Sequence, residues 1–262
     1  MILRNRHSAL LVALTLVLAS CAISDSPDAR PAEIIEQFVE ESGLSGLAVT
    51  VGTNEQIIWS RGFGFADLEQ GVPVDPALTK FRVGSTAKSM TAVAVGQLYE
   101  DGKLDLDAPV QDYLPEFPEK SGVITTRLLA GHLAGIRHYE DDEFLSAISY
   151  ESVTDALSIF ADDSLLNPPG SEYVYSTYGF NLISAVLERA ADENFLDYMA
   201  RNVFAPAGMV STVPDRVLPL IAHRSRYYSI DDGGVVNAPW VDNSNKWSGG
   251  GFLSTSEDLA RF

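Results

Sequence analysis

Apolar and polar residues alternate in three different ways over the first part of the chain. Ala32 to Glu41 carries four apolar residues at helical spacing with glutamates between them, which predicts a helix. Leu47 to Val51 and Ile57 to Ser60 are short runs rich in β-branched residues, separated by Gly52-Thr53-Asn54-Glu55, which predicts a hairpin. A longer amphipathic stretch from Ser85 to Asp101, followed by a glycine, predicts a second helix.

Helical periodicity dominates the middle of the chain. The segments that carry it are Thr126 to His132, Val153 to Ala161, Tyr178 to Ala190 and Phe195 to Val203. Strand-like residues return at Arg224 to Ser229. The pattern therefore predicts an α/β (α+β) domain, in which a sheet is interrupted by a mostly helical part and then resumed.

The last residues predict a helix that has only begun. Ser254 and Glu257 fit a capping box, and Leu259 and Phe262 start an apolar stripe. The sequence stops after about two helical turns, before any Gly, Asn or Pro that would end the helix. We therefore expect a C-terminally truncated chain, with an incomplete domain over residues 32–262.

The first residues predict a targeting segment. The apolar run from Ala9 to Ala19 follows two arginines; it is too short to span a membrane but fits the core of a secretory signal. It ends in Leu18-Ala19-Ser20-Cys21, which resembles the lipobox of bacterial lipoproteins and holds the only cysteine. The short, polar and proline-containing segment 21–31 predicts a flexible tether. The lipobox resemblance implies a signal peptide over 1–20 and a lipid anchor on Cys21. It also implies the periplasmic face of the outer membrane, whereas an ordinary signal peptide is the alternative.

Composition narrows the class of function. Hydrophobic residues make up 46% and charged residues 21%, as in a globular protein that buries a core. Lys and Arg number 18 against 36 Asp and Glu, and this acidic balance argues against nucleic-acid binding. A single cysteine permits no cysteine-rich metal site. His132, His138 and His223 lack metal-ligand spacing, so we predict packing or surface roles for them and expect no metal and no cofactor.

A Ser-x-x-Lys pattern stands at the start of the second predicted helix, where Ser85 and Lys88 share one face. The positive helix N-terminus and partial burial both disfavour a charged Lys88 and lower its pKa. A neutral amine beside a hydroxyl is what activates a serine nucleophile. The alternative is a serine cap followed by a solvent-exposed lysine.

A second pattern, Tyr175-Ser176-Thr177, precedes another predicted helix. A tyrosine at the mouth of a helix can relay protons or orient Lys88. Because Tyr173 and Tyr178 cluster with Tyr175, an ordinary packing aromatic is the alternative.

Together these residues resemble the motifs of the serine β-lactamase and penicillin-binding protein family. Phe81 to Ser89 resembles the nucleophile motif, and Tyr175-Ser176-Thr177 stands where the family has Tyr-Ser-Asn. Residues 125–129, 132–139 and 241–255 resemble the branch that contains the animal mitochondrial serine β-lactamase-like protein. The resemblance implies a β-lactamase/transpeptidase-like fold, with an antiparallel sheet flanked by helices and a mostly helical subdomain.

Carried over residue by residue, the resemblance makes Ser85 the acylated nucleophile, Lys88 its base and Tyr175 a helper of proton transfer. Thr177 and Gly250 become candidate substrate contacts. The implied function is a serine hydrolase that acts through an acyl-enzyme on an amide or ester bond. The implied partner is a small-molecule or peptide substrate, such as a β-lactam, a D-amino-acid peptide or an ester. Contact with a membrane is expected only through a lipid anchor, and the oligomeric state stays open.

Two departures from the family pattern keep an alternative open. Thr177 replaces the usual Asn with a shorter hydroxyl side chain. The third motif, Lys or His followed by Thr or Ser and Gly on a late strand, is absent up to Phe262. In the family, that motif supplies one oxyanion donor and the usual partner of a substrate carboxylate. The alternative is a lipid-anchored binding or scaffold protein that keeps the fold without turnover.

Overall fold

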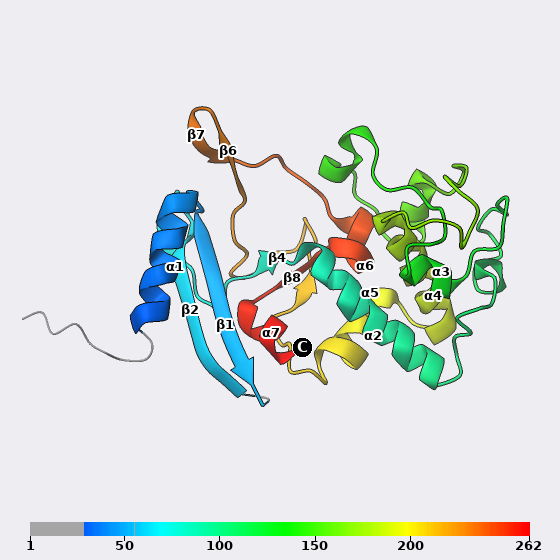
Figure 1. Ribbon diagram of the computed structural model, residues 1–262, viewed down its shortest axis with the longest axis horizontal. Helices are drawn as coiled ribbons and strands as arrows, with labels where there is room; N and C mark the ends of the chain where they lie inside the picture. Colours follow the sequence, from blue (N-terminus) through cyan, green and yellow to red (C-terminus); the bar gives the residue numbers. More distant parts are fainter. Residues whose placement is uncertain (1–28, 55) are drawn as a thin grey trace, which may run out of the picture.

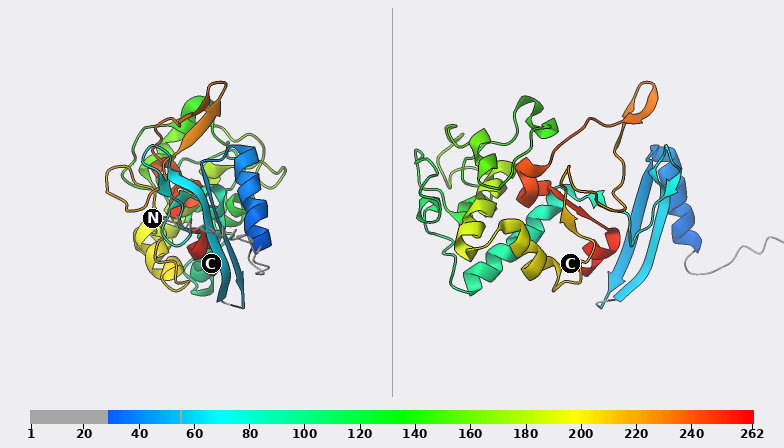
Figure 2. Two further views of the ribbon diagram at one scale, coloured as in Figure 1. Left: turned by 90° about the vertical axis from the view of Figure 1, so that its left-hand side faces the viewer. Right: turned by 180° about the vertical axis from the view of Figure 1, so that it is seen from behind.

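The computed structural model describes residues 29–54 and 56–262, arranged as a layer of long strands beside a larger helical part (Figures 1 and 2). The predicted signal peptide and Cys21 lie outside the described residues. Helix α1 (Ala29–Ser42) confirms the first predicted helix, but it begins inside the segment expected to be a tether. Pro31 is compatible with this helix because backbone N–H groups of the first turn have no helical acceptor.

The predicted hairpin is confirmed and is longer than its β-branched runs. β1 (Gly46–Thr53) pairs antiparallel with β2 (Gln56–Asp67), and the short β3 (Val72–Pro73) lies on the other side of β2. α1 covers one face of this sheet, where Ala32 and Val39 pack with Phe63 in a small separate core.

A second small sheet links the start of the helical part to its end. Its strands are β4 (Phe81–Arg82), β8 (Phe252–Ser254) and β5 (Val213–Pro214), with β8 in the middle and both pairings antiparallel. The pairing of β4 with β8 places the chain just before Ser85 beside the chain just after the glycine run 249–251. This sheet therefore joins two of the predicted motifs.

The predicted strand at Arg224 to Ser229 is correct only at its end. β6 (Tyr228–Asp231) pairs antiparallel with β7 (Gly234–Asn237) as an isolated hairpin. Upstream, the N–H of Ser225 donates to the carbonyl of Lys80 at 3.0 Å, and the N–H of Arg226 donates to Ala66 at 2.8 Å. These amides bind other parts of the fold, so the strand begins later than predicted.

Most of the predicted helices are confirmed. The helical part contains η1 (Gly84–Thr86, a 3-10 turn), α2 (Ala87–Glu100), α3 (Thr126–Ala130), α4 (Thr177–Ala191), α5 (Phe195–Tyr198), the π-helical turn η5 (Met199–Phe204) and α6 (Trp247–Gly250). Shorter 3-10 segments are η2 (Val110–Asp112), η3 (Asp141–Leu145), η4 (Asp155–Ile159) and η6 (Ser244–Lys246). Among the residues described, no helix has the length and apolar character required to cross a membrane.

The α-helix predicted over Val153 to Ala161 is wrong, because this segment forms the 3-10 segment η4. Ser152 and Asp155 exchange hydrogen bonds, each backbone N–H donating to the other's side chain at 3.1 and 3.0 Å. This reciprocal pattern caps the start of a helix. The N–H of Leu157 then donates to the carbonyl of Thr154, three residues back, at 3.0 Å, so the turn continues as a 3-10 helix.

The main core lies where α2 and α4 pack against each other and against α6. Leu98 of α2, Leu182 of α4 and Phe252 of β8 are all completely buried. Truncating such a leucine to alanine typically costs about 2–5 kcal/mol of the free energy of unfolding. The elements that carry the site residues are thus the most deeply packed in the molecule.

The last described helix, α7 (Ser256–Arg261), begins one residue later than predicted. Its cap is Thr255, whose hydroxyl accepts from the N–H of Asp258 at 3.1 Å. Ser254 instead belongs to β8, and the carboxylate of Glu257 accepts from the hydroxyl of Ser60 at 3.0 Å. The predicted capping box is therefore wrong in its partners, because β8 continues through Ser254.

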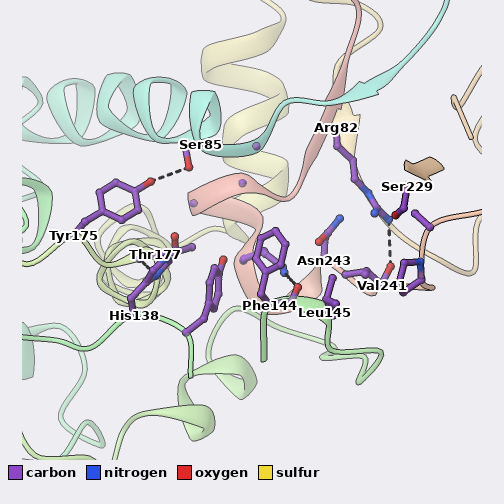
Figure 3. A pocket seen from close by; sticks show the side chains of 17 residues that line it. Arg82, Ser85, His138, Phe144, Leu145, Tyr175, Thr177, Ser229, Val241 and Asn243 are labelled. Atoms are coloured by element: carbon purple, nitrogen blue, oxygen red, sulfur yellow. Dashed lines mark hydrogen bonds between the residues drawn. The ribbon is translucent and has the colours of Figure 1, made fainter. Parts of the chain in front are cut away.

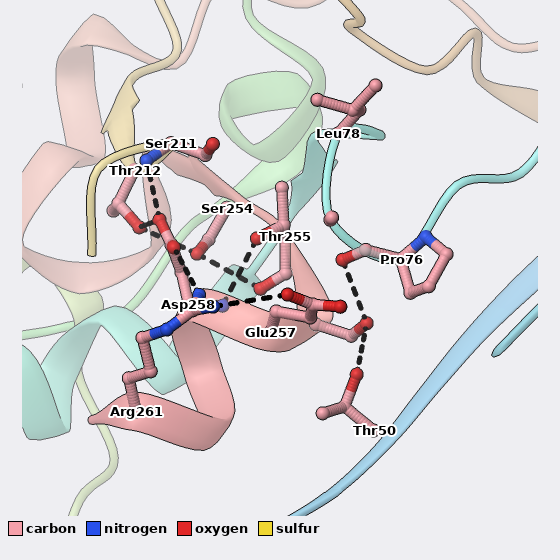
Figure 4. Close-up of polar contacts among 12 residues, drawn as sticks. Thr50, Pro76, Leu78, Ser211, Thr212, Ser254, Thr255, Glu257, Asp258 and Arg261 are labelled. Carbon is pink, nitrogen blue, oxygen red and sulfur yellow. Dashed lines mark hydrogen bonds and ion pairs between the residues drawn. The ribbon is translucent and has the colours of Figure 1, made fainter. Parts of the chain in front are cut away.

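Polar contacts join α7 to both parts of the fold (Figure 4). The buried carboxylate of Asp258 accepts from the N–H of Ser211 at 2.7 Å and the hydroxyl of Thr212 at 2.9 Å. On the other side, the hydroxyls of Ser256 and Thr50 of β1 lie 2.8 Å apart. α7 thus connects the hairpin layer with the helical part.

Candidate active site

The nucleophile candidate stands at a sharp change from strand to helix. After β4, Gly84 adopts φ 52°, a left-handed conformation that glycine takes without steric cost. Ser85 follows in η1 with its side chain at the surface, and Lys88 lies in the first turn of α2 with only 8% of its surface exposed. The solvent-exposed lysine of the alternative interpretation is therefore wrong.

Lys88 is bound by oxygens on three sides. Its Nζ lies 3.4 Å from Ser85 Oγ, 3.2 Å from Thr177 Oγ1 and 2.6 Å from the carbonyl of Gly249. Burial lowers the pKa of Lys88, and a hydrogen bond with Tyr175 opposes the shift only in part. The amine is thus neutral more often than a lysine in water.

Tyr175 contacts the nucleophile from the opposite side, where its hydroxyl donates to Ser85 Oγ at 2.8 Å (Figure 3). The next residue, Ser176, caps α4 by accepting from the N–H of Gly179 at 2.9 Å, which fixes the backbone beside the tyrosine. Burial raises the pKa of Tyr175, but contacts with Lys88 and Ser85 outweigh it, so the pKa lies below its usual value.

Thr177 and the glycine run complete this end of the site. The Thr177 hydroxyl accepts from Lys88, so it reaches the amine despite being shorter than the expected Asn. At Gly249 an added Cβ would lie 2.5 Å from Thr177 Cγ2, and at Gly251 one would lie 2.7 Å from the Asn243 carbonyl. These two glycines therefore allow close packing of α6 against its neighbours.

A cleft extends from Ser85 away from these residues and holds a cavity of about 370 Å³. Apolar side chains from separate segments line it: Tyr139, Phe144, Leu145, Ala238, Pro239 and Val241. The predicted contact Gly250 also lies in its wall, as do the cations Arg82 and Lys246. Among the described residues that line it there is no Asp or Glu, although the chain carries 36 acidic residues.

Lys246 lies almost completely buried in the wall of this cleft. Its Nζ donates to the carbonyl of Phe144 at 2.7 Å and lies 4.8 and 5.0 Å from the ring centroids of Phe144 and Tyr139. Burial and the nearby charge of Arg82 lower the pKa of Lys246 to about 8. The described part of the chain gives Lys246 no ion-pair partner, which distinguishes it from Arg82, whose Nε donates to Asp215 at 2.7 Å.

Two histidines also bind the backbone of the site, and their sequence pattern did not predict this role. His132 Nδ1 accepts from the N–H of Ser176 at 3.1 Å, and His138 Nδ1 accepts from the N–H of Thr177 at 3.2 Å. Besides the predicted packing role, each of these histidines thus accepts a hydrogen bond from the backbone next to Tyr175. Their position within 132–139, one of the segments of family resemblance, was the available signal. Across residues 29–54 and 56–262, no three His, Cys, Asp or Glu side chains are grouped to hold a metal ion.

The structure therefore brings together all five predicted site residues within the described chain. Ser85, Lys88, Tyr175 and Thr177 form one hydrogen-bonded group, and Gly250 lies beside Gly84 in the cleft wall. Their chemical roles stay predictions. The segments that supply them, β4 to α2, the start of α4, and α6, are distant in the sequence.

Comparison with known proteins identifies the family. A family model described as Beta-lactamase matches residues 32–262. The human serine beta-lactamase-like protein LACTB, mitochondrial, is 35% identical over 300 residues, which cover 88% of this chain and 54% of that protein. The chain thus spans about half the length of the curated relatives it matches.

Solved structures agree with this assignment. The penicillin binding protein from Bacillus halodurans superposes with a TM-score of 0.72 at 27% identity, covering 86% of this chain and 70% of that one. The D-amino acid amidase from Ochrobactrum anthropi SV3 gives a TM-score of 0.74 at 22% identity, covering 88% and 68%. The predicted β-lactamase/transpeptidase-like fold is confirmed, with helices around small antiparallel sheets.

Proposed function

Because the chain belongs to the beta-lactamase family, we propose that it is a serine hydrolase that opens an amide or ester bond through an acyl-enzyme on Ser85. One observation carries the proposal. Ser85 Oγ is contacted both by Lys88 Nζ, at 3.4 Å, and by the Tyr175 hydroxyl, at 2.8 Å. A nucleophile in contact with both a base and a second proton carrier is well placed for acyl transfer.

In the proposed reaction, neutral Lys88 removes the proton of Ser85 as its oxygen bonds to the acyl carbon. The backbone N–H of Ser85 is the donor we propose for the developing oxyanion. Tyr175 then donates a proton to the leaving nitrogen or oxygen as its bond to the acyl carbon breaks, and it regains a proton from Lys88. Water next attacks the ester and gives up its proton to the same pair, while Ser85 regains its own.

The cleft favours a substrate that is apolar in part and negatively charged. Tyr139, Phe144 and Leu145 form an apolar wall, whereas Arg82 and Lys246 supply positive charge in a cleft without an acidic side chain among its described lining. We therefore propose a carboxylate-bearing amide or ester. A structural neighbour is a D-amino acid amidase, and a D-amino-acid derivative is a candidate of this class. We also retain the lipid anchor on Cys21, with the domain facing the periplasm, as a proposal.

Active-site labelling tests the acyl-enzyme. Purified protein is incubated with a fluorophosphonate or a penicillin and its intact mass is read; we expect an adduct that the Ser85→Ala variant loses. Ser89→Ala is the matched control because Ser89 lies exposed in the first turn of α2, just after η1, and should keep the adduct. A folded protein that gives no adduct with either probe would overturn the proposal. Saturable substrate binding without product would then favour the binding-protein alternative.

A further inference from the structure

Tyr175 is held between two imidazole rings. The ring of His132 lies 4.5 Å from it, centroid to centroid, at an interplanar angle of 36°, and His138 meets it edge-on at 5.3 Å and 89°. The same imidazoles accept hydrogen bonds from the backbone N–H groups of Ser176 and Thr177, the two residues that follow the tyrosine. Each histidine therefore contacts the ring of Tyr175 and the backbone of one of the two residues that follow it.

These hydrogen bonds determine where each imidazole carries its proton. A backbone N–H can only donate, so the Nδ1 atom that it contacts must offer a lone pair. The proton of each neutral ring is thus on Nε2. Protonation would place an N–H on Nδ1 directly against a backbone N–H, and the contact of His132 with Ser176, or of His138 with Thr177, would be lost.

The surroundings favour the neutral rings. Burial lowers the pKa of both histidines, and the positive charge of Lys88 lowers both further. The charge of His138 also lowers the pKa of His132, and that of Lys246 lowers the pKa of His138. The remaining polar neighbours are the phenols of Tyr139, Tyr173 and Tyr175. Arg137, which donates to the His138 carbonyl, has its charge balanced by Glu143 and Asp163.

We propose that His132 and His138 are positioning residues that hold Tyr175 against Ser85 only while both imidazoles are neutral. Acid then detaches the tyrosine from the nucleophile and slows acylation. The proposal rests on the proposed function, since the tyrosine is positioned for a reaction at Ser85. It makes the rate of acylation depend on two imidazoles that form no hydrogen bond with either Ser85 or Lys88.

The sign of the effect follows from the shifts. Both pKa values lie below the usual 6.5. The rings are therefore neutral at higher pH and become protonated as the pH falls through these lowered pKa values. Deprotonation of Lys88 already makes acylation faster with rising pH. The histidines make the fall of the acylation rate at acid pH steeper, because a ring is about 90% protonated at one pH unit below its own pKa.

Asparagine variants separate the hydrogen bond from the titration. The side-chain oxygen of Asn accepts a hydrogen bond near the position of Nδ1 and does not titrate. At position 132 the backbone has φ 57°, and Asn is among the residues that tolerate this conformation. His138→Phe keeps a ring but removes the acceptor. The control is His223→Asn, because His223 has φ 59°, is exposed and lies outside the cleft lining.

The measurement is the rate at which a neutral fluorophosphonate labels Ser85 between pH 4.5 and 8, with the melting temperature of each variant recorded. We expect wild type and His223→Asn to show the steep acid limb. At one pH unit below the pKa of the replaced ring, His132→Asn and His138→Asn should each keep about tenfold more of their neutral-pH rate than wild type. His138→Phe should be slower at every pH.

A second readout does not depend on labelling. Nitrogen-15 NMR of histidine-labelled protein should give the shifts of the Nε2–H tautomer for both rings. Rings protonated on Nδ1, or asparagine variants that keep the wild-type acid limb, would overturn the positioning proposal and leave the acyl-enzyme intact. Absence of labelling in every variant at every pH would instead overturn the proposed function, and the positioning proposal with it.

Discussion

The two ends of the cleft each contain a buried lysine, and the two lysines have different surroundings. At the nucleophile end, Lys88 contacts three oxygens, including the Ser85 hydroxyl. At the other end, Lys246 donates to one carbonyl and lies beside two adjacent aromatic rings. Burial lowers the pKa of both amines. The first arrangement fixes an amine at a reacting atom, whereas the second leaves a charge available to a ligand.

The difference indicates how one residue type can serve two purposes. A base must be neutral part of the time and must stay within reach of the proton it removes. A residue that binds an anion must stay charged, and its burial is favourable only once the anion is present. Four tests compare the two ends: three variants in order of decreasing expected effect on the rate, and then the pH dependence of substrate selectivity.

Removing the amine of Lys88 should have the largest effect. Lys88→Met keeps an unbranched side chain that is one atom shorter and cannot accept the proton of Ser85, and general-base catalysis is typically worth about 10²–10⁴-fold. We expect the rate of Ser85 labelling to fall by that order. Lys103→Met, at an exposed lysine beyond the end of α2, is the matched control and should label like wild type. A folded Lys88→Met protein that labels at the wild-type rate would show that the base lies elsewhere.

A single methyl group should disturb the nucleophile end without removing any of its functional groups. In Gly249→Ala the new Cβ would overlap Thr177 Cγ2 at 2.5 Å, so Thr177 or the carbonyl that binds Lys88 must move. Misplacement of a catalytic group by about 1 Å can cost about 10²-fold in rate. We expect labelling to slow by tenfold to about a hundredfold.

Two further variants test that explanation. Gly96→Ala places a methyl in open space on α2 and should leave labelling unchanged, while adding about 0.5–1 kcal/mol to the free energy of unfolding. Thr177→Ser removes the overlapping methyl but keeps the hydroxyl, so the double variant Gly249→Ala/Thr177→Ser should recover most of the rate. No recovery would mean that the glycine acts through something other than this contact.

The same contrast shows how far the sequence predicts the site. Ser85 and Lys88 are one helical turn apart, so local periodicity alone places them together. Tyr175 and Thr177 flank the residue that caps a strongly periodic helix, which locates them at its start. Their approach to Ser85 was expected from family resemblance, because no local pattern specifies a contact across ninety residues.

The opposite end could not be predicted in this way. Lys246 and Phe144 lie in short 3-10 segments, where no periodic pattern marks the buried face. Their contact depends on the pairing of β4 with β8 and on the packing of α6 against α4, which are long-range interactions. For the same reason the first helix and the hairpin were predicted well, whereas η4 and the start of β6 were not.

Changing the charge of Lys246 should have the smallest effect and should appear in selectivity. In a solvated cleft we expect one ionic hydrogen bond to contribute about tenfold to affinity, near the lower limit for charged pairs. Lys246→Met should therefore lower kcat/KM for a carboxylate-bearing ester about tenfold and leave a neutral ester of the same shape nearly unchanged. Equal losses on both esters would show that Lys246 supports the fold of the cleft and does not bind the anion.

The pH dependence of that selectivity sharpens the comparison of the two ends. The pKa of Lys246 is about 8, so the cation is present below that pH and is lost above it. The preference of wild type for the charged ester should thus fade as the pH rises through 8. The same rise in pH increases the neutral fraction of Lys88, which favours turnover of both esters. Lys246→Arg keeps its charge, because guanidinium does not titrate in this range, and its preference should persist to pH 9.5. If the arginine variant loses the preference at the same pH as wild type, the titrating group is not Lys246, and the charge at this end must come from another residue.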